Sequence, residues 1–183
     1  MKSAPTKAKM TYDQYRLLPD DGKRYEMIDG ELLTTPAHSP KHQRILGNLF
    51  SELRTHVEAN DLGEVFISPI DVVFEEHLVL EPDILFVARE RQHIVGEEAI
   101  HGAPDLVVEI LSPSSFYHDL RRKLRIYAEF GVREYWIADP EKQTLDLYGT
   151  AANELQLARQ FSCQETFESP LLPGFRLAVS VIF

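Results

Sequence analysis

With 183 residues, 44% of them hydrophobic, and a formal net charge of −10, the chain has the composition of one α/β domain, expected over residues 10–183 after a disordered leader at residues 1–9. The acidic charge argues against nonspecific polyanion binding, and the single cysteine, Cys163, excludes an internal disulfide and a thiolate zinc site within one chain. No apolar run approaches the roughly 18 residues needed to span a bilayer, and the N-terminus has no signal-peptide segment, so we expect a cytoplasmic protein without a membrane partner.

The first predicted elements are a short helix and a β-hairpin. Thr11 can cap a helix that runs to about Leu18, where a proline-containing turn follows. The dipeptide Asp29-Gly30 favours a tight turn, because both residue types tolerate positive φ angles. Residues 24–29 and 31–35 are therefore predicted to pair as a hairpin.

A long helix is predicted next, because Ser39 suits an N-cap and Pro40 suits the first turn. The helix should end at about Asn60. His42 falls near the middle of its apolar face, so it points inward, either as a core histidine or as a residue that touches a site. The apolar residues of that face are Ile45, Leu46, Leu49, Phe50, Leu53 and Val57.

The rest of the chain alternates strands with one further helix, which is the pattern of an α/β domain. This helix is predicted over residues 115–130, with Gly131 as its C-terminal stop. The last two strands lie in the tail and are joined by a proline-containing link. The predicted strands cover residues 64–67, 70–74, 83–87, 105–111, 134–138, 144–148, 155–161 and 175–181.

Two acidic residues lie in apolar surroundings. Asp83 follows Pro82 at the start of one predicted strand, and Glu109 lies inside another, among valine, leucine and isoleucine residues. A buried, ionised carboxylate is costly without a partner, so we expect a cation nearby, and a metal ion is the leading candidate. The alternative is that each carboxylate meets an arginine or a backbone amide and only holds the strands in register.

Lys123 lies on the apolar face of the second long helix, where a charged residue is unexpected. It could extend to the rim, pair with Asp119 one turn earlier, or neutralise an internal carboxylate. The helix directly follows the Glu109 strand and should fold back over the sheet, which would bring Lys123 close to Glu109. Two carboxylates and an ammonium group suit metal-assisted phosphodiester hydrolysis, in which the lysine positions the nucleophile or stabilises developing charge.

An acid after proline at a strand start, followed by an acid inside the next core strand, resembles the PD-(D/E)XK restriction-endonuclease-like superfamily. The lysine of the usual Glu-x-Lys element is missing, because Leu111 stands in its place, and Lys123 from the following helix could fill the same space. More closely, the chain resembles the Uma-two family of putative restriction endonucleases over about residues 10–148. The matching motifs are Tyr25-Glu26-Met27-Ile28-Asp29-Gly30-Glu31, His42, Glu81-Pro82-Asp83, residues 105–114, Asp119 with Lys123 and Tyr127, and Gly131-Val132-Arg133-Glu134-Tyr135-Trp136.

This resemblance implies an α/β fold with a restriction-endonuclease-like core, in which a mixed β-sheet is flanked by helices, with an N-terminal hairpin and extra C-terminal strands. It also implies a homodimer that acts on nucleic acid, in the first place DNA. Without the resemblance, Glu26 could equally be an exposed hairpin carboxylate paired with Arg24 or Lys23. The catalytic residues implied around Mg²⁺, or alternatively Mn²⁺, are Glu26, Asp83, Glu109 and Lys123, and the implied metal ligands are Asp83, Glu109 and Ile110.

Two classes of function follow from these observations. The first is a magnesium-dependent endodeoxyribonuclease in which Asp83 and Glu109 ligate the metal, Glu26 assists and Lys123 orients the attacking water, leaving a 3′-hydroxyl and a 5′-phosphate. The second is a non-catalytic module that keeps the nuclease fold and binds nucleic acid or protein. A hydrolase built on Ser, Cys and His has little support, because the sequence contains no nucleophile elbow.

Overall fold

Three α-helices and two short 3₁₀ helices lie in the part of the chain that the structure describes. The computed structural model describes residues 8–19, 21–35, 37–112, 117–151 and 154–183. Residues 1–7 of the predicted leader, and the predicted helix start at Ser115 and Phe116, lie outside these ranges. No helix in these ranges is both long and apolar enough to cross a membrane. The helices are α1 (Tyr12–Tyr15), α2 (Pro40–Ala59), η1 (Arg89–Ile94), α3 (Tyr117–Glu129) and η2 (Val179–Val181).

The described strands form two larger sheets and a two-stranded ribbon. The N-terminal half contributes β1 (Arg24–Ile28), β2 (Glu31–Thr35), β3 (Gly63–Ile67), β4 (Val72–Glu75), β5 (Leu78–Leu80), β6 (Ile84–Ala88) and β7 (Ile100–His101). The C-terminal half contributes β8 (Leu106–Ile110), β9 (Glu134–Asp139), β10 (Thr144–Ala151), β11 (Glu154–Ser162), β12 (Thr166–Glu168) and β13 (Arg176–Ala178).

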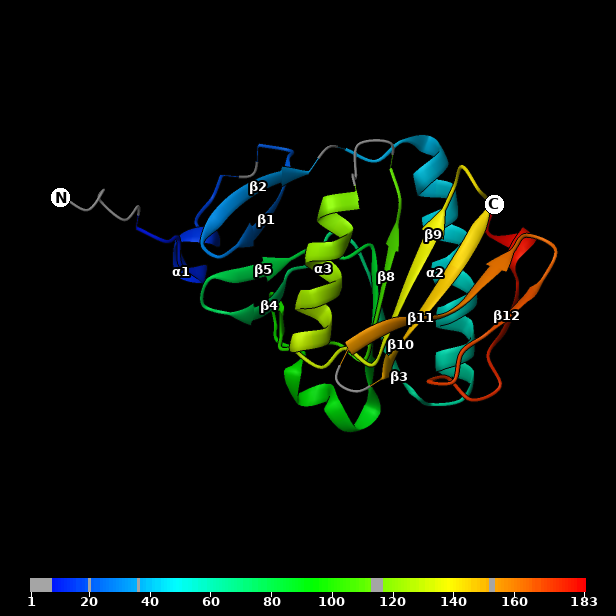
Figure 1. Cartoon of the computed structure of the whole chain (residues 1–183). Helices are drawn as coiled ribbons and strands as arrows, with labels where there is room; N and C mark the ends of the chain where they lie inside the picture. The colour runs from blue at the N-terminus through cyan, green and yellow to red at the C-terminus, as the bar shows by residue number, and fades with distance from the viewer. Residues whose placement is uncertain (1–7, 20, 36, 113–116, 152–153) are drawn as a thin grey trace.

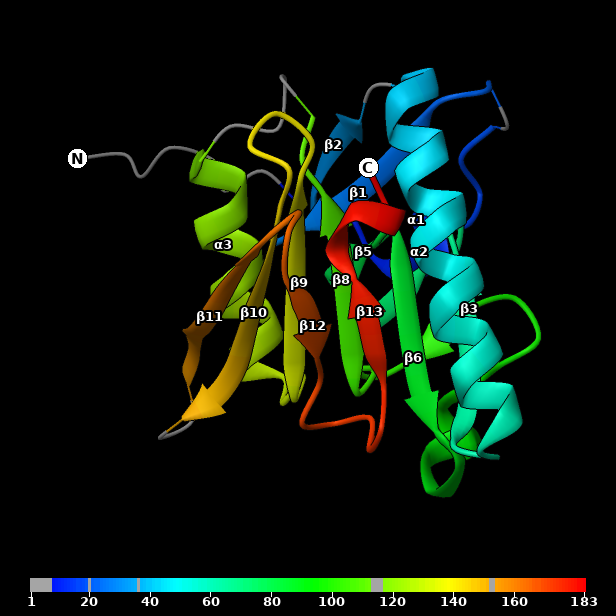
Figure 2. The same cartoon turned by 90° about the vertical axis from the view of Figure 1, so that its right-hand side faces the viewer.

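The larger sheet has the order β11-β10-β9-β8-β6-β3 and lies at the centre of the molecule (Figure 1). β8 and β9 run parallel, whereas the other neighbouring strands are antiparallel, so the sheet is mixed, as predicted. α3 connects the two parallel strands, because a parallel pair needs a long crossover. α2 covers one face of this sheet and α3 covers the opposite face (Figure 2).

Alternate side chains of β8 serve two separate cores. On the α2 side, Val108 packs in one cluster with Leu49, and on the α3 side, Val107 packs in another with Tyr127. Glu109 has the same orientation as Val107, because side chains two residues apart on a strand point to the same face. The Glu109 carboxylate is therefore directed toward α3.

The N-terminal hairpin belongs to a second sheet, in the order β2-β1-β5-β4-β7. Its turn is the predicted one, with φ angles of 57° at Asp29 and 74° at Gly30. A Cβ atom added to Gly30 would lie 2.5 Å from the Cβ atom of Lys9, so the turn leaves no room for a side chain. β1 pairs with β5, and three residues later the chain enters β6, so the hairpin is held beside the start of β6.

The short elements differ from the predicted ones. α1 ends at Tyr15 instead of Leu18, and turns follow it. The sequence does not predict β5, β7 or β12, because two or three residues are too few to show a hydrophobic period. The strand predicted over residues 175–181 is too long, because β13 ends at Ala178 and a 3₁₀ helix over Val179–Val181 follows.

Candidate functional site

Glu26 of β1 lies in the interior of the molecule. It is 1% exposed, and its Oε1 accepts the N–H of Glu81 at 3.2 Å. Arg24 and Lys23 pair instead with Glu81 and Asp21. The interpretation of Glu26 as an exposed hairpin carboxylate is therefore wrong, because the pairing of β1 with β5 buries this position.

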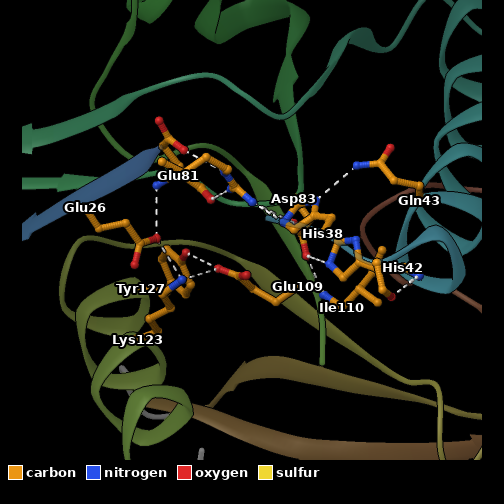
Figure 3. A network of polar contacts seen from close by, with 12 residues as sticks. Glu26, His38, His42, Gln43, Glu81, Asp83, Glu109, Ile110, Lys123 and Tyr127 are labelled. Carbon is orange, nitrogen blue, oxygen red and sulfur yellow. Dashed lines mark hydrogen bonds and ion pairs between the residues drawn. The ribbon is translucent and has the colours of Figure 1, made fainter. Parts of the chain in front are cut away.

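Lys123 reaches Glu26 from α3. Its Nζ lies 2.8 Å from Glu26 Oε1 and 3.0 Å from Glu109 Oε1 (Figure 3). Because Lys123 is only 6% exposed, it does not extend to the rim of the helix. The side chain of Asp119, the alternative partner, lies outside the described part of the chain. The prediction that the helix folds back and brings Lys123 to Glu109 is confirmed.

One oxygen of Glu109 accepts two hydrogen bonds. Lys123 Nζ donates to Oε1 at 3.0 Å and the Tyr127 hydroxyl donates to the same atom at 2.9 Å. Burial raises the pKa of Glu109 to about 7, against the lowering effect of Lys123, while the negative charges of Asp83 and Glu26 raise it further. Burial also raises the pKa of Tyr127 well above its usual value, so its hydroxyl keeps the proton that it donates. A carboxyl group that titrates near neutral pH in such a cluster is typical of functional sites.

The pairing of β6 with β8 brings the two predicted acids together. The antiparallel register pairs Ile84 with Val108, so its continuation by one residue places Asp83 opposite Glu109. Residues that face each other in this way have neighbouring side chains. In Figure 3, Glu109 lies between Lys123 and Asp83 in one network of polar contacts. The two acids therefore lie side by side at neighbouring strands of the central sheet.

Asp83 is held by groups on its own side of the network. It is 3% exposed, and its Oδ2 accepts the Ile110 N–H at 2.8 Å and lies 3.1 Å from His42 Nε2. Burial favours a higher pKa for Asp83, but the hydrogen bonds from His42 and the Ile110 amide outweigh it, so the pKa is lowered. The alternative interpretation, in which the carboxylate only holds the strands in register, expects an arginine or a backbone amide as its partner. The Ile110 amide is such a partner. His42 points inward, as predicted, and contacts the site.

Three further residues border Asp83, and sequence reasoning did not identify them as part of the site. Arg24 Nε lies 2.8 Å from Glu81 Oε2, and Arg24 Nη1 contacts His38 Nε2. His38 Nε2 in turn lies 3.4 Å from Asp83 Oδ1. Burial lowers the pKa of His38 to about 4, with Arg24 acting in the same direction, so its ring is neutral at neutral pH. For His38, the one available signal was its position directly before Ser39, the N-cap of the helix that carries His42, which places both histidines at the same helix end.

Carboxylates outnumber cationic side chains among the described residues of this network. The carboxylates are Glu26, Glu81, Asp83 and Glu109, and the cationic partners are Arg24 and Lys123. A hard divalent cation with oxygen ligands would compensate the excess negative charge. The Ile110 side chain packs in the core on the α2 side, so this residue could offer a metal only its main-chain carbonyl.

Other polar and aromatic candidates have structural partners away from this network. Asp105 is fully buried and lies 3.1 Å from Arg91 and 3.6 Å from Arg133. Tyr135 and Trp136 are buried on opposite sides of the central sheet. Asp105 is therefore a structural ion-pair residue, and the two aromatic residues stabilise the sheet.

Known proteins share the sequence pattern and the fold of this chain. The profile of the Uma2 (Uma-two) family, described as "Putative restriction endonuclease", matches residues 12–180. The structure is similar to the crystal structure of a putative nuclease belonging to DUF820 from Anabaena variabilis ATCC 29413, with a TM-score of 0.79 and 23% identity over 95% of this chain and 97% of that chain. No curated protein matches the chain significantly. The structural likeness confirms the predicted α/β fold.

Proposed function

Because the chain belongs to the Uma2 family of putative restriction endonucleases, we propose that it is a metal-dependent endodeoxyribonuclease that hydrolyses phosphodiester bonds. The observation that carries the proposal is the meeting of Lys123 with Glu109 and Glu26, beside Asp83, in the interior of the fold. An ammonium group among buried carboxylates is the arrangement expected where phosphate charge is stabilised and water is activated.

The carboxylate set fits a magnesium ion, with manganese as the alternative. Asp83, Glu109 and the main-chain carbonyl of Ile110 would hold it, since hard cations prefer oxygen ligands. When bound, the ion would polarise the phosphate and lower the pKa of a coordinated water molecule. The hydrogen bond from the Ile110 amide orients the Asp83 carboxylate, and it keeps that group ionised, as a metal ligand must be.

The protein side chains would bind and orient the reacting groups. Lys123 presents a buried ammonium group that can position the attacking water or stabilise charge on the phosphate. Glu26 fixes that ammonium group from the hairpin side at 2.8 Å. Glu109 titrates near neutral pH in the metal-free protein, so binding of the ion would release a proton from this carboxyl group. Tyr127 holds the Glu109 carboxylate in place through its hydroxyl.

Cleavage of plasmid DNA tests the proposal. The wild-type protein is incubated with supercoiled DNA and Mg²⁺ or Mn²⁺, with EDTA added in a parallel reaction, and the products are analysed for 3′-hydroxyl and 5′-phosphate ends. Asp83→Asn and Glu109→Gln should each reduce metal-dependent cutting by at least about a hundredfold. Glu97→Gln, in an exposed loop, is the matched control and should cut like wild type.

The result also decides between catalysis and binding alone. Cutting by Asp83→Asn and Glu109→Gln at the wild-type rate would refute the proposed active site. Binding of Mg²⁺ without turnover on DNA or RNA would favour the non-catalytic module that keeps the nuclease fold. We further propose that the enzyme acts as a homodimer, which light scattering coupled to size-exclusion chromatography would test by giving twice the mass of one chain.

A further inference from the structure

His38 and His42 flank Asp83 and form with it a cluster of nitrogen and oxygen donors that the proposed mechanism does not use. One ligand atom from each of the three residues lies within 4.8 Å of the others. The centroids of the two imidazole rings are 3.7 Å apart, and Figure 3 shows both rings beside Asp83. His42 comes from α2 and Asp83 from the start of β6, so residues far apart in sequence build the cluster.

His38 presents a lone pair to a cation. Its Nε2 contacts Arg24 Nη1, and a guanidinium group can only donate hydrogen bonds. With Nε2 as the unprotonated, accepting nitrogen of a neutral imidazole, Nδ1 carries the proton, and the Gln43 side-chain amide beside Nδ1 at 3.2 Å must present its oxygen to that proton. The neutral imidazole is the form of histidine that binds metal ions. The positively charged Arg24 guanidinium already lies next to His38 Nε2 and 3.9 Å from Asp83 Oδ1, so the surroundings of these two atoms favour a cation.

His42 does not have the contacts of a fully satisfied core histidine. It is 5% exposed, and its Nε2 faces Asp83 Oδ2 at 3.1 Å, but its Nδ1 has no hydrogen-bond partner among the described residues. Buried polar atoms in proteins are nearly always paired, so the unpaired Nδ1 of an imidazole ring whose Nε2 already faces the Asp83 carboxylate needs an explanation. A ligand that binds at this imidazole supplies one.

We propose that His38, His42 and Asp83 bind a divalent first-row transition-metal ion, at a position distinct from the carboxylate site of Glu109. Imidazole nitrogen suits Fe²⁺, Ni²⁺ and Zn²⁺, whereas Mg²⁺ and Ca²⁺ prefer oxygen ligands, and Mn²⁺, which also accepts carboxylate, serves as the paramagnetic probe of the site. The inference rests on the proposed function in one respect, because Asp83 belongs to both ligand sets. Arg24 would leave His38 Nε2, and its two hydrogen bonds to Glu81 would keep it beside the site.

Electron paramagnetic resonance of bound Mn²⁺ tests this site without requiring turnover. Pulsed measurements detect nitrogen nuclei that are directly bound to the ion, and the loss of the free-ion signal measures affinity. The wild-type protein should show coupling to imidazole nitrogen. His38→Ala and His42→Ala should each weaken Mn²⁺ binding at this site by at least about tenfold and reduce or remove that coupling. His93→Ala, in exposed η1, is the matched control and should retain both.

Glu109→Gln separates the two sites. This variant should lose metal-dependent cutting but keep the nitrogen coupling of Mn²⁺. A wild-type protein whose bound Mn²⁺ shows no nitrogen coupling, or coupling that persists in both histidine variants, would overturn the inference. Because His42 lies in the core, His38→Ala keeps the test decisive if His42→Ala unfolds. Nitrogen-ligated Mn²⁺ without any cleavage would refute the proposed function alone, and Mg²⁺-dependent cleavage without nitrogen coupling would refute this inference alone.

Discussion

Replacing Glu109 by glutamine should change how the stability of the protein depends on pH. Burial raises the pKa of Glu109 from the ordinary 4.5 to about 7, so the folded protein holds a proton that the unfolded chain has released. The stabilisation from this group is complete below pH 4.5 and is lost as the pH rises through about 7. Each unit of pKa difference corresponds to about 1.4 kcal/mol, so the whole loss amounts to about 3–4 kcal/mol.

Urea unfolding of wild type and Glu109→Gln, at pH 5 and pH 8.5 in the presence of EDTA, measures this loss. Glutamine keeps the shape of the side chain but does not titrate, so the variant should gain about 2–3 kcal/mol relative to wild type between the two pH values. Glu97→Gln, which alters an exposed loop carboxylate, should follow wild type at both pH values. Parallel pH profiles for wild type and Glu109→Gln would show that Glu109 is ionised throughout and would refute the reasoning.

Three further substitutions test other parts of the structure. Lys123→Met should lower the cleavage rate at least about a hundredfold while Mg²⁺ still binds, as measured by calorimetry; unchanged cleavage would remove Lys123 from the mechanism. Glu134→Gln should cost about 2 kcal/mol in thermal unfolding, because the carboxylate accepts hydrogen bonds from Trp136, Ser169 and Leu171 and the amide nitrogen cannot. Gly30→Ala should cost about 1–2 kcal/mol, since its φ angle is 74°; equal stability would mean that the turn rearranges.

Local sequence signals predicted the elements that carry the acids and the lysine. The dipeptide Asp29-Gly30 gave the hairpin, Ser39-Pro40 gave the start of α2, and the apolar period of α3 placed Lys123 on its inner face. Each of these signals involves residues within a few positions of one another. The position of Glu109 beside Lys123 could also be predicted, because a short connection between a strand and a helix leaves few ways to fold back.

Contacts that depend on the second sheet could not be predicted in this way. Arg24, His38 and Glu81 meet only because β1 pairs with β5, and β5 is too short to show a pattern in the sequence. The contact of the Tyr127 hydroxyl could not be predicted either, because a tyrosine on an apolar helix face is expected to be a core residue. Its hydrogen bond to Glu109 forms because the Glu109 side chain projects from β8 toward α3.

The position of the lysine on a helix explains why a third carboxylate belongs to the site. A lysine at position 111, directly after β8, would have the same sheet backbone as Glu109 to fix its direction, but Leu111 occupies that place. Lys123 arrives instead on a long, flexible side chain, whose rotamer freedom must be restricted by a partner. Glu26 supplies that partner at 2.8 Å, and it would keep the ammonium group in place when a metal ion draws the Glu109 carboxylate away. In the proposed mechanism, the N-terminal hairpin would contribute to the site by fixing Lys123, a role that requires Glu26 to be buried even if it never binds the metal.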